Sequence, residues 1–193
     1  MSTTPPTFPT VGIVGTGAMG RGIAQIAAQA GSTVILFDTQ AAAIEKAREA
    51  LGAQWNKLVE KGRLTAEQAT GHKERLKSAA ALADLAPCDL VVEAVVERLD
   101  VKKSLFGELE DIVAPTAVLA TNTSSLSVTA IAAGLKRPNQ FAGYHFFNPV
   151  PLMKVVEVIA GLKTDAPTCQ RLTEFARQMG HTPVQAGDTP GFI

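Results

Sequence analysis

Residues 11–22 read Val11-Gly-Ile-Val-Gly15-Thr-Gly17-Ala-Met-Gly20-Arg-Gly22, and the apolar run at their start breaks into three glycines spaced Gly-x-Gly-x-x-Gly. A segment rich in alanine and isoleucine follows over residues 23–30. This order indicates a strand, a tight turn and a helix. The first glycine allows a backbone angle that side chains disfavour, the second lets a ligand approach the backbone, and the third lets the helix pack on the strand. The turn leaves free N–H groups at a helix N-terminus, where the dipole favours a pyrophosphate.

A second predicted strand, residues 33–37, ends at Asp38. A carboxylate at this position accepts hydrogen bonds from the adenosine ribose and repels a 2′-phosphate, so the unit favours NAD over NADP. Glycine turns also occur for purely structural reasons, but a strand, glycines, a helix, a second strand and an acid in one unit favour a cofactor site. The predicted cofactor contacts in this unit are Gly15, Gly17, Ala18, Met19, Gly20 and Asp38.

Composition excludes several classes of protein. The chain has 193 residues, 46% of them hydrophobic, and 18 basic and 18 acidic side chains, so no net charge attracts nucleic acid or an anionic membrane. No apolar run approaches the roughly 18 residues of a membrane span. Cys88 and Cys169 match no metal or redox spacing. We therefore expect a reduced, cytoplasmic protein with no metal, and a loose, proline-containing tail over residues 1–10.

Two helical segments follow Asp38. In the first, apolar side chains recur at spacings of three and four from Ile44 to Leu58, and Gly62 ends the helix. The second is polar, covers about residues 65–76 and contains His72, which we expect at the surface. This excursion is longer than a minimal strand–helix–strand unit requires. It is either a solvated hairpin or a carrier of cationic contacts to a second ligand, and the residues alone favour the hairpin.

Residues 89–97 form an apolar run typical of a buried parallel strand, but Glu93 and Glu97 interrupt it near its carboxyl end. Ligands bind at that end in open α/β sheets, so each carboxylate is either a ligand contact or a solvated loop residue. The next strand, residues 118–121, opens into a hydroxyl-rich segment. Its hydroxyls either cap a helix over residues 128–133 or donate to a ligand, and both uses are compatible. Between the two strands we expect a helix that buries Val101, Leu105, Leu109 and Ile112.

His145 ends a strand among aromatic residues, and Glu157 lies in the middle of the apolar strand that follows. Burying a carboxylate costs several kcal/mol unless a charge or a hydrogen bond meets it. Pairing Glu157 with His145 gives the acid a partner and orients the imidazole. We expect His181, like His72, at the surface.

A helix over about residues 165–179 and a strand over residues 181–185 complete the pattern. The expected fold is therefore α/β, a Rossmann-type doubly wound and mostly parallel sheet with a helical excursion after its second strand. Residues 11–187 form the predicted NAD-binding domain. Residues 188–193 form a Pro-Gly hinge that we expect to lead into a further domain.

From Val11 onward the chain resembles the NAD-dependent 3-hydroxyacyl-CoA dehydrogenases. His145-Phe-Phe-Asn-Pro-Val-Pro151, with Lys154-Val-Val-Glu157 after it, is far more specific than the glycines. The other matching motifs are Gly15-x-Gly17-x-x-Gly20, Asp38, Val92-Glu-Ala-Val-Val-Glu97, Asn122-Thr-Ser-Ser-Leu126 and Asp188-Thr-Pro-Gly-Phe-Ile193.

The resemblance implies a role for each matching residue in the NAD-linked oxidation of a 3-hydroxyacyl-CoA to a 3-oxoacyl-CoA. His145 would be the catalytic base, Glu157 its partner, and Ser124 a donor to the C3 oxygen. The expected contacts around them are Asn148 beside the substrate, Glu97 and Lys102 beside the nicotinamide half of the cofactor, and Asn122 against the cofactor.

The resemblance also implies a second, all-helical domain that closes over the acyl-CoA and forms a homodimer. Without it, we expect this chain to bind NAD but to be inactive or weak. The choice of pathway, fatty acid β-oxidation or a related one, is a separate question that these residues leave open. The excursion helps to hold CoA in the family, which makes Lys57 and Lys61 weak candidate contacts. Gln54 departs from the serine that some members have thereabouts.

Two rival functions remain open. One is a non-catalytic NAD-binding relative, which the presence of His145, Glu157 and Ser124 disfavours. The other is a different nicotinamide-dependent oxidoreductase, such as another hydroxyacid dehydrogenase. A short-chain dehydrogenase would need Tyr-x-x-x-Lys, whereas Tyr144 is followed at that spacing by Asn148.

Overall fold

The computed structural model describes residues 4–192, and within them eight strands form one sheet in the order β3-β2-β1-β4-β5-β6-β7-β8. All neighbours are parallel except β6 and β7, which run antiparallel. The predicted doubly wound, mostly parallel α/β sheet of Rossmann type is confirmed. The strands are β1 (Thr10–Val14), β2 (Thr33–Phe37), β3 (Leu76–Ser78), β4 (Leu90–Glu93), β5 (Val118–Thr121), β6 (Phe141–Phe146), β7 (Val155–Ala160) and β8 (Thr182–Gly187).

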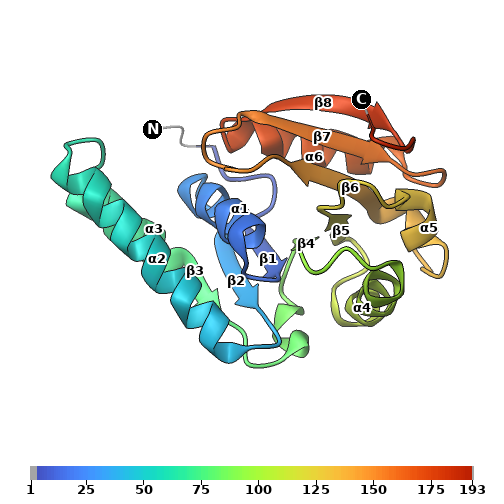
Figure 1. Cartoon of the computed structure of the whole chain (residues 1–193), viewed down its shortest axis with the longest axis horizontal. Coiled ribbons are helices and arrows are strands. Elements are labelled where there is room, and N and C mark those ends of the chain that lie inside the picture. Colours follow the sequence, from blue (N-terminus) through green and yellow to red (C-terminus); the bar gives the residue numbers. More distant parts are fainter. Residues whose placement is uncertain (1–3, 193) are drawn as a thin grey trace.

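Helices cover both faces of this sheet (Figure 1). They are α1 (Ala18–Gln29), α2 (Ala41–Glu60), α3 (Ala66–Arg75), α4 (Leu99–Ile112), α5 (Val128–Ala132) and α6 (Ala166–Gln178), with short 3-10 helices at Leu82–Leu85 and Pro138–Gln140. Successive strand side chains point to opposite faces. Leu90 and Val92 of β4 therefore join a core shared with α1 and α6, and Val91 joins a core shared with α4 and α5. Because both faces of β4 are covered, Leu90, Val91 and Val92 form a continuous hydrophobic run.

The direction of winding changes at β1. The chain moves outward from β1 to β2 and β3, and then returns to place β4 on the other side of β1. The carboxyl ends of β1 and β4 therefore border a crevice, which is where open α/β sheets bind ligands. Gly15, Ala94 and Asn122 directly follow β1, β4 and β5, so the sequence motifs meet at this edge.

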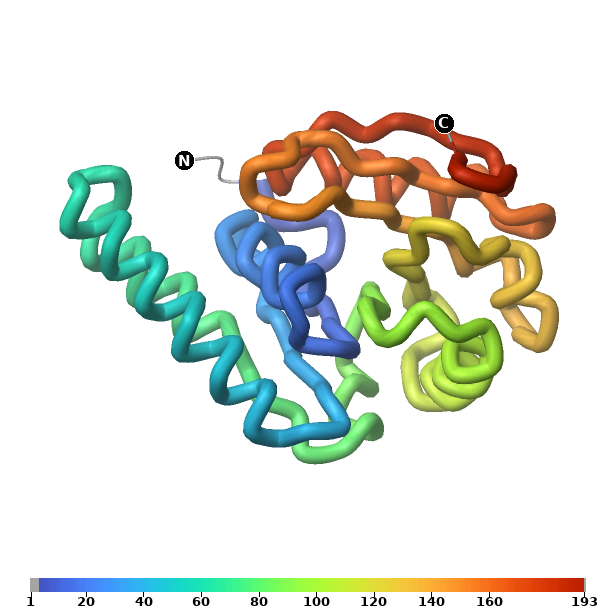
Figure 2. Tube along the Cα trace, in the orientation of Figure 1, coloured from blue at the N-terminus to red at the C-terminus, as the bar shows by residue number. Residues whose placement is uncertain are grey.

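The α2–α3 excursion extends away from the sheet (Figure 2), and it buries a histidine that we expected at the surface. His72 is 9% exposed, and its ring lies 5.4 Å from the ring of Trp55 in α2. His181 is 3% exposed, with its ring nitrogens against the carbonyls of Met179 and Val150. Both surface predictions are wrong, because helix packing covers one ring and backbone carbonyls hold the other. None of the helices within residues 4–192 is both long and apolar enough to cross a membrane.

The residues before β1 are packed rather than loose. Phe8 is fully buried, and its ring meets that of Phe175 in α6 edge to face, with centroids 5.3 Å apart. The backbone N–H of Thr7 donates to the side chain of Gln178, and Thr10 already belongs to β1. The prediction of a loose tail is therefore wrong for residues 7–10. Residues 1–3 of that tail, and residue 193 of the predicted hinge, lie outside the described residues.

Candidate active site

The glycine turn has the geometry that a pyrophosphate site requires. Gly15 has φ +93°, a conformation that favours glycine, and a Cβ there would lie 2.6 Å from the carbonyl oxygen of Ala94. A Cβ on Gly20 would lie 1.8 Å from the carbonyl oxygen of Gly15, so only glycine lets α1 pack this closely. Gly17 caps α1 without a side-chain hydrogen bond, and its Cβ position is open. The first N–H groups of α1 therefore remain available to an anion.

The substitutions Gly17→Ala and Gly20→Ala are expected to separate cofactor binding from folding. A methyl group at position 17 meets nothing within 4 Å, so the Tm should hold, while the methyl group blocks the approach of the pyrophosphate. NADH affinity should fall at least about tenfold, or 1.4 kcal/mol. At position 20 the clash forces α1 outward, and the Tm should fall by about 2–4 °C per kcal/mol of strain. NADH fluorescence titration and thermal melting measure both effects. Equal losses of Tm in the two variants would contradict this assignment.

Asp38 directly follows β2, and its carboxylate is held in place. Its Oδ2 accepts from the backbone N–H and the hydroxyl of Thr16, both at 2.9 Å, and its Oδ1 accepts from the N–H of Gln40 at 3.0 Å. Burial alone would raise the pKa of Asp38, but the hydrogen bonds from Gln40 and Thr16 outweigh burial and lower it. An ionised carboxylate at this edge suits ribose hydroxyls and repels a phosphate. Thr16 was not among the predicted contacts, although a hydroxyl residue between two turn glycines is a usable signal in the sequence.

Two adjoining clefts run along the carboxyl edge of the sheet. The first, of about 410 Å³, contains Gly15, Gly17 and Asp38. The second, of about 340 Å³, is lined by Met19, Glu97, Asn122, Ser124, His145 and Asn148 among others. Ala94 and Val95 line both clefts, so an extended ligand can pass from one to the other. No group of three or more His, Cys, Asp or Glu side chains in the described part of the chain could hold a metal.

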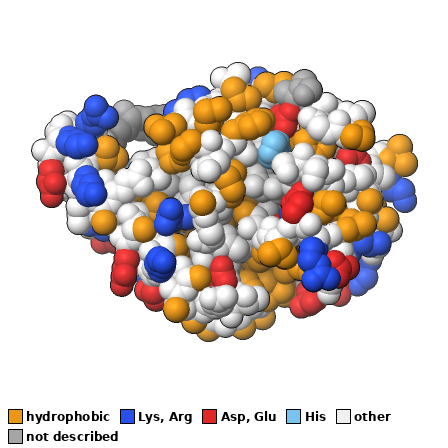
Figure 3. Space-filling model, viewed as in Figure 1, with side chains coloured by type: hydrophobic (Ala, Val, Ile, Leu, Met, Phe, Trp, Pro, Cys, Tyr) orange, Lys and Arg blue, Asp and Glu red, His pale blue; other side chains and the backbone are white. Residues whose placement is uncertain are grey.

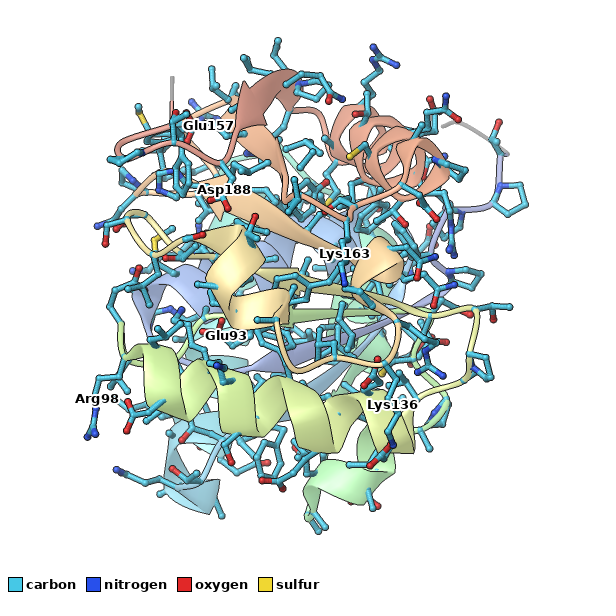
Figure 4. The ribbon with its side chains drawn as sticks, turned by 90° about the vertical axis from the view of Figure 1, so that its right-hand side faces the viewer. Glu93, Arg98, Lys136, Glu157, Lys163 and Asp188 are labelled. Carbon is cyan, nitrogen blue, oxygen red and sulfur yellow. The ribbon has the colours of Figure 1, made fainter. Side chains whose placement is uncertain are left out.

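His145 and Glu157 meet as cross-strand neighbours of the antiparallel β6–β7 pair. Nδ1 of His145 lies 2.5 Å from Oε2 of Glu157, and the two side chains are 14% and 4% exposed. Because an ionised carboxylate only accepts hydrogen bonds, Nδ1 carries the proton and Nε2 can accept one. His145 lines the second cleft, between the rings of Phe147 and Phe192 at centroid distances of 4.6 Å and 5.8 Å. Figure 4 labels Glu157, which lies on β7, the strand next to the edge strand β8.

Glu93 and Lys102 form a fully buried ion pair behind the second cleft. Nζ of Lys102 lies 2.8 Å from Oε1 of Glu93 and 3.1 Å from Oε2 of Glu97. Glu93 is therefore neither a solvated loop residue nor a ligand contact. Lys102 is fully buried and lines neither cleft, so the structure does not place it in direct contact with a ligand there, and of its two ion-pair partners only Glu97 lines the second cleft. The predicted inward face of α4 is also shifted, because Lys102 and Phe106 are buried where Val101 and Leu105 were expected.

The predicted capping use of the hydroxyl-rich segment is confirmed, and donation from this segment to a ligand stays a prediction. Thr123 donates its hydroxyl to Glu97, and Ser127 caps α5 by accepting from the N–H of Ala130. Ser124 is exposed in the second cleft, and its N–H donates to Glu97 over 3.2 Å. Burial alone would raise the pKa of Glu97, but the Thr123 hydroxyl and the charge of Lys102 lower it.

Of the remaining predicted contacts, the two asparagines line the second cleft and the two lysines lie outside both clefts. Asn122 lines the second cleft while its Oδ1 accepts from the N–H of Phe146 at 2.9 Å. Asn148 lines the same cleft and also a neighbouring cavity. Lys57 lies in the last turn of α2, Lys61 follows it as the C-cap, and neither lines the two clefts.

Asp188 ties the end of β8 to the start of α5, a role that the sequence analysis did not assign. Its carboxylate accepts from the N–H groups of Val128 and Thr129 and from the hydroxyl of Ser127, at 2.8–2.9 Å (Figure 4). Burial alone would raise the pKa of Asp188, but hydrogen bonds from Thr129, Ser127 and Val128 lower it. The proximity of residues 127 and 188 is a tertiary feature, so no local signal revealed it.

Replacing Asp188 by asparagine should lower the Tm at pH 7, and the loss should disappear in acid. A carboxylate whose folded pKa is depressed stabilises the protein above its unfolded value of about 4, and this stability is lost as the pH falls through the folded pKa. Asp111→Asn, at an exposed ion pair on α4, is the matched control and should change the Tm little at either pH. Thermal melts at pH 7 and pH 3 compare the variants. A Tm difference that stays constant between these pH values would count against the ionised cap.

A family model described as the NAD-binding domain of 3-hydroxyacyl-CoA dehydrogenase matches residues 10–189. The chain belongs to this family. The 3-hydroxyadipyl-CoA dehydrogenase of Escherichia coli K12 is 47% identical over 184 residues, which cover 95% of this chain and 39% of that protein. A probable 3-hydroxybutyryl-CoA dehydrogenase of Deinococcus radiodurans is 45% identical over 184 residues, 94% of this chain and 65% of that protein. The chain thus spans between two fifths and two thirds of the length of these relatives.

Solved structures agree with this membership. A crystal structure of 3-hydroxybutyryl-CoA dehydrogenase from Escherichia coli K12 superposes with a TM-score of 0.94 at 47% identity, covering 95% of this chain and 39% of that one. The (S)-3-hydroxybutyryl-CoA dehydrogenase PaaH1 from Ralstonia eutropha gives 0.93 at 38% identity, with coverages of 96% and 66%. The prediction of NAD as the cofactor is confirmed by the family, and the glycine turn and Asp38 fit it.

Proposed function

We propose that this chain is the cofactor-binding part of an enzyme that oxidises the 3-hydroxyl group of an acyl-CoA to a ketone and also catalyses the reverse reduction. The observation that carries the proposal is the His145–Glu157 pair, in which the acid is buried and the imidazole faces the second cleft beside Ser124. A protein that only held a nucleotide would have no use for an oriented imidazole and a hydroxyl donor at the same edge of the sheet.

In the proposed mechanism, Nε2 of His145 takes the proton of the 3-hydroxyl group as the C3–H bond breaks. Glu157 fixes the tautomer with a proton on Nδ1 and stabilises the imidazolium that forms. The hydroxyl of Ser124 donates to the C3 oxygen and stabilises the charge that develops there. NAD, held by the glycine turn and Asp38, supplies the hydride acceptor when it is bound. With its pyrophosphate at the turn and its adenosine at Asp38, the nicotinamide belongs in the second cleft.

The CoA portion would leave this cleft toward α2. A cavity of about 250 Å³, lined by Arg21, Gln54 and Asn148 among others, adjoins the second cleft at Asn148 and reaches α2 at Gln54. Lys57, in the last turn of α2, and Lys61, its C-cap, lie further toward the end of the helix and would meet the phosphates of CoA. Their contribution remains a proposal, as does that of Asn148 to substrate binding.

A further helical domain would cover this face and join two subunits. Hydrophobic side chains gather over the β6–β7 loop and β7 (Figure 3), where Leu152 and Met153 are 75% and 45% exposed. The chain's 39–65% share of its relatives leaves length for such a domain. The family match ends at residue 189, next to the Asp188 cap. This end point supports a domain over residues 11–187 and a hinge over residues 188–193. We place the enzyme in the cytoplasm, in keeping with two free, buried cysteines in the described residues.

Turnover of acetoacetyl-CoA with NADH tests the proposal, in the chain alone and in the chain joined to the C-terminal part of the Escherichia coli relative. We expect the chain alone to bind NADH with little or no turnover, and the fusion to reduce the substrate. Short, long and dicarboxylic 3-oxoacyl-CoAs then define the acyl specificity. A folded fusion that binds NADH and reduces none of them would refute the proposed activity and favour a non-catalytic relative. Full activity of the chain alone would refute the need for a second domain.

A further inference from the structure

Glu93, Lys102 and Glu97 form a cluster of fixed charges. The Glu93 carboxylate accepts hydrogen bonds from three groups. The hydroxyl of Thr121 and the N–H of Val95 each donate to it at 2.7 Å, and Nζ of Lys102 donates to both of its oxygens. These partners are all donors, so Glu93 needs no proton and is a carboxylate. Within residues 4–192, the hydrogen bonds and ion pairs of Lys102 Nζ are with carboxylate oxygens, as expected of an ammonium. With Glu97 ionised, two negative charges meet one positive charge, and the cluster has a net charge of about −1.

The negative charge of this cluster borders the second cleft and not the first. Glu97 lines the second cleft together with Ser124 and His145, whereas the first cleft, which contains Asp38, has no residue of the cluster in its wall. Glu93 and Lys102 are fully buried, and Glu97 is 36% exposed. Thr123 and Ser124 hold the Glu97 carboxylate from its other side. The charges of Glu93 and Lys102 are therefore fixed out of contact with water before any ligand arrives, and Glu97 presents its carboxylate in the wall of the cleft.

We propose that this cluster makes the site discriminate between the oxidised and reduced forms of the cofactor, in favour of NAD⁺. The two forms differ in charge at the nicotinamide ring, which is positive in NAD⁺ and neutral in NADH. A fixed negative charge beside the ring stabilises the positive form, and the effect is strong where the surroundings are poorly polarisable. Glu97 presents the charge, and Glu93 with Lys102 positions it. The inference rests on the proposed location of the nicotinamide in the second cleft.

The test is the ratio of two dissociation constants, Kd for NAD⁺ over Kd for NADH, measured by calorimetry on the intact chain. Glu97→Gln keeps the shape of the side chain and removes one negative charge, so the ratio should rise about tenfold. Glu93→Gln removes the same charge from a side chain that contacts no ligand, and the ratio should rise in the same direction by a smaller factor. Glu108→Gln, on the exposed face of α4, is the matched control and should leave the ratio unchanged. Thermal melts confirm that each variant is folded.

The outcomes separate this inference from the proposed function. If Glu97→Gln weakens both forms by the same factor, the cofactor contacts Glu97 but the charge does not select between its forms, and the inference alone fails. If Glu97→Gln changes neither constant, the nicotinamide lies elsewhere, and both the inference and the proposed placement fail. Should Glu93→Gln not fold, the partly exposed Glu97 still decides between these outcomes.

Discussion

Replacing His145 by glutamine is expected to lower kcat by about 10²–10⁴-fold while leaving the Kd for NADH almost unchanged. Glutamine has a similar reach and can still donate to Glu157, so β6 and β7 keep their pairing. It has no nitrogen that accepts a proton near neutral pH. Because NADH needs the glycine turn and Asp38 rather than the imidazole, its affinity should survive. Steady-state reduction of acetoacetyl-CoA by the fusion protein measures kcat, and NADH fluorescence measures Kd.

His72→Gln is the matched control for this prediction. His72 is buried against Trp55 in the α2–α3 excursion, outside the two clefts, so its loss should lower the Tm and leave kcat unchanged. Turnover close to that of the unmodified protein in His145→Gln would remove His145 from the role of base. A loss of NADH binding as large as the loss of kcat would instead assign His145 to cofactor binding.

Much of the fold could be predicted because its signals are local in the sequence. The glycine turn, the strand after it and Asp38 lie within one short unit, and their order alone indicates a Rossmann-type sheet. The contact of His145 with Glu157 was predictable for another reason. A carboxylate in an apolar strand needs a partner, and the neighbouring strand offers a histidine that the carboxylate can orient and whose charged form it can stabilise.

The errors concern contacts between residues that are distant in sequence or that break the hydrophobic pattern. Phe8 was assigned to a loose tail because its partner, Phe175, lies at the other end of the chain. His72 lies in a polar helix, and only the packing of α3 on α2 buries it. In α4 a lysine occupies the inward face, which an apolar pattern does not predict. Once Glu93 is known to be buried at the end of β4, the inward Lys102 has a physical reason.

Lys102→Met should lower the free energy of unfolding by about 3–5 kcal/mol, the usual cost of breaking a buried ion pair. Methionine fills a similar volume, but Glu93 then keeps a charge that no cation offsets, at a position with no access to water. Urea denaturation at pH 7 should show a lower midpoint with an unchanged slope. Lys103→Met is the matched control, because Lys103 is the exposed neighbour on the same helix and its loss should matter little.

The double variant Glu93→Gln/Lys102→Met distinguishes loss of charge pairing from loss of packing. The carbonyl oxygen of a glutamine at position 93 can still accept from the N–H of Val95, its NH2 group can donate to the hydroxyl of Thr121, and no buried charge is left without a partner. The double variant should therefore be more stable than Lys102→Met alone, with a coupling free energy of about 1–3 kcal/mol. If the double variant is as unstable as the sum of its single changes, the side-chain volume of Lys102 matters and its charge does not.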